Sequence, residues 1–285
     1  MDIEYTATLT NPIPVTVSFV NDFSLMSWLD GITTMKDFPL VASVSYALDS
    51  SAQLSPEFME ASSVQFMKAG AMGITLVVAS GDRGVWGFEG FGQKFHPEFP
   101  ASSPFVTTVG ASNLQTKSMV GTESAWTCSG GGFSTEFLQP SWQSEAISSY
   151  LQLARSKGML PPTNFFNMEG RGYPDVTTIG GPTNPYCVSQ GDGDHVGVSG
   201  TSGSASVIAA VFAVINNVRL AQNKPPLGFA NPFLYANKQC FKDIADFTKN
   251  SCLQGTSMGY SSIAGWDPAS GLGIPDFECL SKLDV

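Results

Sequence analysis

The chain has 285 residues, of which 42% are hydrophobic and only 13% are charged, and its net charge is −10. A chain of this length can bury a large core, and we expect one domain over residues 1–285. The acidic balance and the lack of basic clusters exclude nucleic acid as a partner. No run reaches the roughly 18 apolar residues that a membrane span needs, so we expect no membrane association. We also expect a monomer.

Short β-branched runs and helical stretches alternate along the first part of the chain. Four such runs occupy residues 15–20, 39–47, 74–82 and 105–112. They are apolar on both faces, as strands buried inside a parallel sheet are. Between the second and third runs, Ser55 is placed to cap a helix that starts at Pro56 and ends at Gly73. This strand, helix, strand order predicts an α/β fold.

The second half of the chain divides into two parts of different composition. Glycine, proline, serine and asparagine are frequent over residues 113–200, which predicts long surface loops. From Ser204 to about Leu220 the chain is strongly apolar, which predicts a helix in the middle of the fold, packed against the sheet.

The five cysteines are scattered and form no CxxC pair, so a zinc cluster is not expected. Cys240 and Cys252 are near enough in the sequence to close a short loop. The odd count leaves at least one thiol free, and an oxidising compartment is compatible with this pattern without being required by it.

The segment VGVSGTSGSAS, at residues 196–206, precedes the apolar helix and raises the question of a nucleophile. A serine at the start of a central helix is close to free backbone N–H groups and to the positive end of the helix dipole, which stabilise a developing oxyanion. Ser202 is the candidate. The alternative is that Ser199, Thr201, Ser202 and Ser204 only cap the helix.

A serine nucleophile needs a proton acceptor, and the chain has two histidines. His96 lies beside a proline in an expected loop, and His195 lies in a glycine-rich stretch shortly before Ser202. Neither is expected to serve as the base. A carboxylate is the expected acceptor, and because it stays ionised at about pH 4–5, where histidine is protonated, such an enzyme should prefer acid.

Asp82 follows a strongly apolar predicted strand, in the stretch ASGDRGVWG. The carboxyl ends of parallel strands are where α/β sheets place their chemistry. A protonated aspartic acid at this edge could donate a hydrogen bond to an oxyanion at low pH. The alternative is an ordinary turn between Gly81 and Gly84.

Seven segments together resemble the sedolisin family of serine-carboxyl peptidases. They are SGD around Asp82, FPASSPFVTTVGAS at 99–112, SGGGFS at 129–134, RGYPDV at 171–176, GTSGS around Ser202, PPLGFANPFLY at 225–235 and GWDPASGLGIPDF at 265–277. They cover nearly the whole chain in the family's order, which is far more specific than any single motif. The resemblance implies a subtilisin-like α/β fold, with a mainly parallel sheet flanked by helices and a C-terminal calcium-binding loop region.

The resemblance also implies catalytic roles. Ser202 matches the nucleophile, Asp82 the oxyanion aspartate, and Asp2, in the opening MDIEY, the triad aspartate. The triad glutamate would stand four residues before Asp2, and Glu4 does not replace it because positions two apart face different sides of a helix. The opening also lacks the features of a signal peptide. We therefore expect a chain truncated at its N-terminus, without pro-domain or signal peptide.

Binding residues follow from the same resemblance. Ser129, Gly130 and Gly131 match the substrate-lining strand, where glycines let a peptide backbone pair with the enzyme; otherwise they form a flexible loop. Calcium ligands match Asp243 and Asp267 together with the carbonyls of Ile244, Ile263 and Gly265, and such hard oxygens suit Ca²⁺. Arg83 stands where the family usually has a small residue, and Ala205-Ser206 where it usually has Thr-Pro.

The implied reaction is acid hydrolysis of peptide bonds in peptide or protein substrates. Ser202 attacks, the glutamate with Asp2 accepts its proton, Asp82 stabilises the oxyanion, and water releases the acyl-enzyme. The nearest branch of the family removes N-terminal tripeptides in the lysosome, so we expect that specificity and a lysosomal, vacuolar or extracellular location. Two alternatives are a pseudopeptidase that only binds peptides through the cleft, and a subtilisin-type enzyme that depends on His195 and has a neutral optimum.

Overall fold

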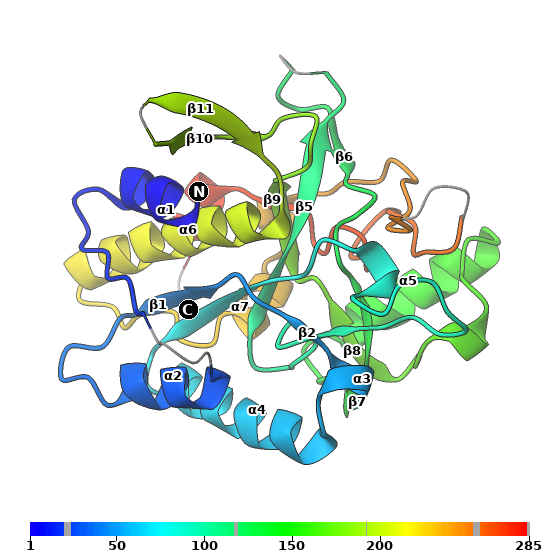
Figure 1. Ribbon diagram of the computed structural model, residues 1–285, viewed down its shortest axis with the longest axis horizontal. Helices are drawn as coiled ribbons and strands as arrows, with labels where there is room; N and C mark the ends of the chain where they lie inside the picture. Colours follow the sequence, from blue (N-terminus) through cyan, green and yellow to red (C-terminus); the bar gives the residue numbers. More distant parts are fainter. Residues whose placement is uncertain (20–23, 117–118, 192, 253–256, 284–285) are drawn as a thin grey trace.

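The computed structural model describes residues 1–19, 24–116, 119–191, 193–252 and 257–283. Its centre is a sheet in which β1 (Val41–Val44), β3 (Thr75–Ala79) and β5 (Thr107–Leu114) are parallel neighbours. Strand β9 (Val176–Ile179) pairs parallel with β5, and β6 (Glu123–Ala125) pairs antiparallel with the end of β5. The predicted α/β fold with a mainly parallel sheet is confirmed (Figure 1).

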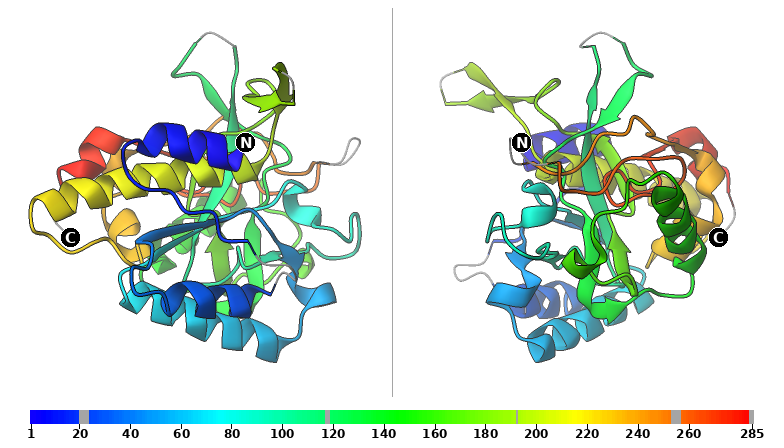
Figure 2. Two further views of the ribbon diagram at one scale, coloured as in Figure 1. Left: turned by 60° about the vertical axis from the view of Figure 1, so that its left-hand side comes forward. Right: turned by 90° about the vertical axis from the view of Figure 1, so that its right-hand side faces the viewer.

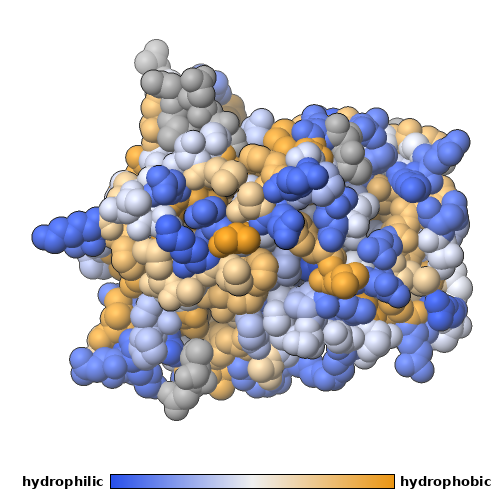
Figure 3. Space-filling view, turned by 90° about the horizontal axis from the view of Figure 1, so that it is seen from below, coloured by the Kyte–Doolittle hydropathy of each residue, from blue (hydrophilic) through white to orange (hydrophobic). Residues whose placement is uncertain are grey.

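Helices cover both faces of this sheet. On one face lies α6 (Thr201–Ala221), which contacts β1, β3, β5 and β9 and has α1 (Asp2–Thr10) packed along it (Figures 1 and 2). On the other face lie α4 (Pro56–Ala71) and α2 (Leu25–Thr33). On the surface seen from that side, hydrophobic and hydrophilic residues are intermixed (Figure 3).

Strand β3 shows how the sequence builds these layers. Val77 and Ala79 belong to the core cluster that contains the α6 side chains, whereas Leu76 and Val78 belong to the cluster that contains α2 and α4. Successive side chains of a strand point to opposite faces, so a strand that is covered on both sides must be apolar at every position. This explains the unbroken run ITLVVA in the sequence.

Helix α4 begins and ends as predicted. The Ser55 hydroxyl accepts a hydrogen bond from the Phe58 amide, and Pro56 is the first helical residue. Gly73 follows the helix with φ of +94°, a conformation that side chains with a Cβ rarely adopt.

The predicted first strand is wrong over its described part. Residues 15–19 form no strand, and residue 20 lies outside the described residues. The side chains of Val15, Val17 and Phe19 are 41%, 59% and 83% exposed. Apolar composition alone predicted the strand, whereas among the described residues the sheet has its edge at β1 and no strand beyond it.

The prediction that residues 113–200 form long surface loops is also wrong. Besides β6 and β9 they contain β7 (Gly132–Leu138), α5 (Ser144–Ser156), β8 (Gly170–Tyr173), β10 (Tyr186–Gln190) and β11 (Asp194–Val198). One of the glycines in this region allows close packing inside the protein, since a Cβ added to Gly172 would lie 2.4 Å from the Trp266 ring. The remaining elements are β2 (Leu48–Asp49), α3 (Ser50–Gln53), β4 (Glu98–Phe99), α7 (Asn231–Ala236), β12 (Phe241–Lys242), β13 (Ile274–Pro275) and α8 (Phe277–Ser281), with 3-10 turns at Gly84–Trp86, Thr163–Phe165 and Lys238–Cys240.

Two disulfides join segments that are distant in the sequence. They link Cys128 to Cys252 and Cys240 to Cys279, and Cys187 is an exposed free thiol. The suggested loop between Cys240 and Cys252 is therefore wrong, whereas a free thiol was expected. Cys279 reaches Cys240 because β12 pairs with β13 immediately before α8.

The RGYPDV motif forms a buried polar network. Arg171 and Asp175 are fully buried and ion-paired at 2.6 Å. Asp175 also accepts hydrogen bonds from the Thr108 amide at 2.7 Å and from the Tyr235 hydroxyl at 3.0 Å. Burial raises the pKa of Asp175, and the Arg171 guanidinium opposes that rise. The network ties β5, β8 and α7 together.

Helix α6 is long and apolar enough to cross a membrane by length and hydropathy, which corrects the expectation that no segment is. More than half of its most apolar window is buried inside the protein. Its apolar character is accounted for by packing between the sheet and α1.

Candidate active site

The carboxyl edge of the parallel sheet brings together three segments that are far apart in the sequence. Ser45 follows β1, Asp82 follows β3 after two residues, and α6 starts beside both of them. The Ser45 hydroxyl donates to the Ser202 carbonyl at 3.5 Å, and the Gly81 amide donates to Thr201 Oγ1 at 3.1 Å. This is the edge where α/β sheets carry their chemistry.

Asp82 caps the start of α6 from outside the helix. Its Oδ1 accepts hydrogen bonds from the Thr201 amide at 2.7 Å and from the Thr201 hydroxyl at 2.9 Å. A Cβ added to Gly200 would lie 2.9 Å from Asp82 Oδ2, so the glycine keeps this approach open. No side chain local to the helix caps it. The alternative in which the nearby serines only cap α6 is therefore wrong.

Ser202 lies in the first turn of α6 and is partly exposed. Its hydroxyl makes no hydrogen bond to any other described residue. Amides in the first turn have no acceptor inside the helix, and the dipole of a 21-residue helix adds positive potential there. An oxyanion beside Ser202 would meet both effects.

Asp2 is the first residue of α1, which packs against α6. Its neighbour Met1 lies so close that its sulfur would be 2.9 Å from a Cβ added to Gly203. Asp2 and Ser45 line one cavity of about 480 Å³ between α1, β1 and α6. The structure thus brings Asp2 to the same end of α6 as Ser202.

Glu4 is directed elsewhere. It accepts a hydrogen bond from the Ser189 amide at 3.1 Å and pairs with the N-terminal ammonium group at 3.1 Å. The bond from Ser189 is the main cause that lowers the pKa of Glu4. This geometry agrees with the prediction that Glu4 does not replace the triad glutamate.

The SGGGFS segment lies against the loop that carries Asp82. The Gly130 amide donates to the Gly81 carbonyl at 2.7 Å, and a Cβ on Gly130 would lie 2.0 Å from the Ser80 carbonyl oxygen. Ser129 Oγ accepts from the Ala111 amide at 3.0 Å, and the Gly131 carbonyl accepts from the Asn250 side chain at 3.3 Å. These buried, bonded residues do not form a loose loop, and they place a backbone segment next to the Asp82 loop.

Neither histidine is bonded to the candidate nucleophile. His195 is exposed on β11, with Nδ1 3.4 Å from the Ser189 hydroxyl. His96 faces Glu89 at 3.1 Å. This arrangement agrees with the prediction that neither histidine is the base.

Sequence reasoning missed a buried pair of carboxyl groups behind the Asp82 loop. Asp49 and Glu98 are 0% and 2% exposed and lie opposite each other in the β2–β4 pair. The Glu98 carboxyl packs under Gly81, where an added Cβ would be 2.2 Å from Oε2. Burial, and then the charges of Asp49 and Asp82, raise the pKa of Glu98 to about 8, while Arg83 opposes the rise. The sequence signal was an acid inside an apolar stretch, HPEFPA.

The C-terminal loops place two carboxylates close together. Asp267 is fully buried and accepts hydrogen bonds from the amides of Ile263, Ala269 and Ser270 at 2.8–3.0 Å. Asp243 accepts from the Gly265 amide at 2.8 Å. Burial raises the pKa of both carboxyls, and the charge of Asp243 raises that of Asp267 further.

The donor chemistry of this loop suits a hard cation. Among the described residues no three His, Cys, Asp or Glu side chains gather as a metal cluster. The candidate set combines two carboxylates with backbone carbonyls, which is the type of ligand set that Ca²⁺ takes. A cation there would relieve the repulsion between two carboxylates that share a partly buried loop.

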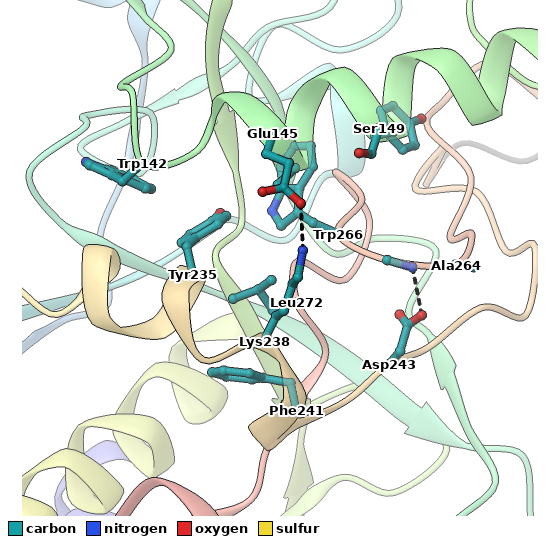
Figure 4. A pocket seen from close by; sticks show the side chains of 13 residues that line it. Trp142, Glu145, Ser149, Tyr235, Lys238, Phe241, Asp243, Ala264, Trp266 and Leu272 are labelled. Atoms are coloured by element: carbon teal, nitrogen blue, oxygen red, sulfur yellow. Dashed lines mark hydrogen bonds and ion pairs between the residues drawn. The ribbon is translucent and has the colours of Figure 1, made fainter. Parts of the chain in front are cut away.

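A separate cavity of about 280 Å³ adjoins this loop (Figure 4). Trp142, Tyr235 and Trp266 line it, and an ion pair between Glu145 and Lys238 at 2.8 Å lies beside them. It lies beside the loops that carry Asp243 and Gly265, and Ser202, Asp2 and Asp82 are not among the residues that line it.

The fold and the site define a serine peptidase scaffold of the subtilisin type, and the chain belongs to the subtilase family, whose profile matches residues 14–226. Within that family it is a relative of the sedolisin-type tripeptidyl peptidases, as the motifs indicated. It is 40% identical over 262 residues to tripeptidyl-peptidase 1 of Rattus norvegicus and 39% identical over 264 residues to that of Homo sapiens. Each match covers 90% of this chain and 45% of the relative, so the chain spans about half the length of these relatives.

A solved structure shares the fold. The chain aligns with Pseudomonas sedolisin, a serine-carboxyl proteinase solved with two molecules of pseudo-iodotyrostatin, with a TM-score of 0.67 and 23% identity. The alignment covers 85% of this chain and 64% of that one. The match supports the subtilisin-like arrangement of sheet and helices.

Proposed function

We propose that this chain carries the catalytic centre of an acid serine-carboxyl peptidase. The observation that carries the proposal is the bond between the Asp82 carboxylate and the first amide of α6, one residue before Ser202. This bond brings an acid side chain and the start of a long helix to one point. Both can stabilise negative charge on an oxygen that forms beside Ser202.

In the proposed mechanism, Ser202 Oγ attacks the carbonyl carbon of the peptide bond and its proton passes to a carboxylate. Asp2, next to the start of α6, would hold and polarise that acceptor, which the family resemblance assigns to a glutamate four residues before Asp2. Asp82 uses Oδ1 for Thr201, and among the described residues its Oδ2 accepts no hydrogen bond. In its protonated form this oxygen would donate to the oxyanion, together with an amide of the first helical turn.

The protonated acceptor would give this proton to the leaving amine as the C–N bond breaks, which releases the C-terminal product and leaves the acyl-enzyme. Water would then attack the acyl-enzyme and give a proton to the same carboxylate, which would pass it to Ser202 Oγ as the ester bond breaks. A carboxylate acceptor stays ionised at about pH 4–5, and the proposed hydrogen bond from a protonated Asp82 to the oxyanion is favoured by acid. Histidine-based catalysis would instead be impaired at the same pH.

For the substrate we propose unblocked peptides from which N-terminal tripeptides are removed, because the relatives at 40% identity carry that activity in their name. We place the protein in a lysosome-like acidic compartment or outside the cell. The two disulfides support an oxidising environment, where such bonds persist. Ser129, Gly130 and Gly131 would line the substrate next to the Asp82 loop.

We also propose that Asp243, Asp267 and the carbonyls of Ile244, Ile263 and Gly265 hold one Ca²⁺. Its role would be structural, since these loops adjoin the cavity of Figure 4, which Ser202, Asp2 and Asp82 do not line. The ion would lock two carboxylates whose burial otherwise favours their neutral forms.

The test compares peptide cleavage at pH 4 and pH 7 by this chain with a glutamate supplied four residues before Asp2, and by the Ser202→Ala and Asp82→Asn variants of that protein. We expect cleavage at pH 4, no cleavage by Ser202→Ala, and a loss of about 10²–10³-fold in kcat for Asp82→Asn. Ser199→Ala is the matched serine control and should retain activity. Cleavage that persists in Ser202→Ala would contradict the proposal. Inactivity of the parent at both pH values would favour the peptide-binding pseudopeptidase.

A further inference from the structure

Arg83 stands directly after Asp82, and both side chains are exposed. Its guanidinium lies 4.5 Å from the centre of the Phe88 ring, a cation–π distance. Among the described residues no carboxylate lies within ion-pair distance of it. The positive charge therefore faces solvent beside the candidate oxyanion site.

The backbone on both sides of Arg83 is fixed. Asp82 is bonded to Thr201, and the Gly84 amide donates to the Cys128 carbonyl at 3.0 Å. Gly84 has φ of +59°, and an added Cβ would lie 2.2 Å from the Asn250 carbonyl oxygen. Little freedom is left for the chain to move Arg83 away from the site.

The platform under the guanidinium is fixed as well. The amides of Phe88 and Glu89 donate to the buried Asp49 carboxylate at 2.9 and 2.7 Å. Asp49 is 0% exposed, so water does not compete for these two hydrogen bonds. Arg83 is thus held in place by stacking before any ligand arrives, which reduces the entropy lost when it binds one.

We propose that Arg83 selects peptide substrates that carry a carboxylate side chain within about two residues of the scissile bond. The inference rests on the proposed function, because it places the bond at Ser202 and Asp82. Consecutive Cα atoms are about 3.8 Å apart and an extended peptide rises about 3.3 Å per residue, so a side chain attached next to Asp82 covers about that stretch of substrate. An unpaired guanidinium binds a carboxylate by charge-assisted hydrogen bonds.

A purely structural role for Arg83 is the competing explanation. Its charge lowers the pKa of Glu98, so Arg83 could serve only to offset the acid groups Glu98, Asp49 and Asp82 behind and beside it. A structural role predicts a change in stability when the charge is removed and no change in the preference between charged and neutral peptides. The two roles therefore predict different ratios of kcat/KM between charged and neutral peptides.

The test uses pairs of peptides that differ by Glu or Gln at each of the two positions on either side of the cleaved bond. It is made at pH 5.5, where a free glutamate is ionised. We expect the parent to cleave the best Glu peptide about two- to five-fold more efficiently in kcat/KM than its Gln partner, as an exposed ion pair allows. Arg83→Gln should bring that ratio to about one, and Arg83→Lys should retain part of it. Arg155→Gln, at an exposed arginine on α5, is the control.

The same peptides, labelled with a fluorophore, are titrated against Ser202→Ala with and without Arg83→Gln. Anisotropy then reports binding without catalysis. If no peptide is cleaved by the parent, the proposed function fails, and the binding ratio still decides the role of Arg83. A Glu-to-Gln ratio that is near one in the parent, or that survives Arg83→Gln, overturns the inference.

Discussion

Replacing Glu98 by glutamine is the substitution for which the structure predicts the clearest dependence on pH. Glu98 is 2% exposed, lies opposite Asp49 and packs under the loop of Asp82. Burial, with the charges of those two aspartates, raises its pKa from 4.5 to about 8. A difference of this size corresponds to about 5 kcal/mol between the two protonation states, as an upper value.

The sign follows from proton binding. Below pH 4.5 the Glu98 carboxyl is neutral in both the folded and the unfolded chain, so its burial does not lower the free energy of unfolding. As the pH rises from 4.5 to about 8, the unfolded chain releases this proton while the folded protein keeps it. The free energy of unfolding therefore falls across that window by up to about 5 kcal/mol, and above it Glu98 causes no further loss. This is a large part of a typical total stability of about 5–15 kcal/mol.

Glutamine keeps the shape and stays neutral, so Glu98→Gln should remove most of this fall. We expect nearly equal stability of parent and variant at pH 4, and a variant that is more stable by several kcal/mol at pH 8. Urea unfolding followed by tryptophan fluorescence at pH 4, 5, 6, 7 and 8 measures the slope. Glu60→Gln, at an exposed acid on α4, is the control and should follow the parent. Parallel loss of stability in the parent and Glu98→Gln would refute the reasoning.

Two further predictions concern the buried network and the metal. Arg171→Met leaves the carboxylate of Asp175 buried without its partner, so the free energy of unfolding, measured by urea denaturation, should fall by about 3–5 kcal/mol. Arg155→Met, at an exposed arginine, should change it little. Equal effects of the two substitutions would contradict the buried ion pair. Ca²⁺ added to the chelator-treated protein, at about 100 times the Kd for Ca²⁺, should stabilise the protein by about 2.7 kcal/mol and raise its Tm. Asp267→Asn should abolish this effect. Asp30→Asn, at an exposed acid on α2, is the control and should not. An unchanged Tm in the parent would speak against the site.

The sequence predicted those parts of the fold that local pattern determines. Strands β1, β3 and β5 were recognisable because they lie within short runs rich in β-branched and apolar residues, and α4 because Ser55 and Gly73 mark its ends. The start of α6 was predicted within a few residues. The segment at residues 15–19 failed because apolar composition does not reveal whether a neighbouring strand is available.

The candidate site was predicted only for the residues that lie in recognisable motifs. Ser202 and Asp82 were found from their positions beside a helix start and a strand end. Glu98 and Asp49 were missed, because each lies on a two-residue strand and they meet only when β2 pairs with β4. The disulfide of Cys240 was also missed, because its partner is brought near by α8 at the far end of the chain.

The most direct test of the account is the pH profile of kcat/KM for a tripeptide-releasing substrate, measured from pH 3 to pH 8 on the chain with a glutamate supplied four residues before Asp2. The account predicts a maximum below about pH 5, little activity at pH 7, and the same profile for His195→Ala. A neutral optimum that disappears in His195→Ala would contradict a carboxylate-based centre at Ser202.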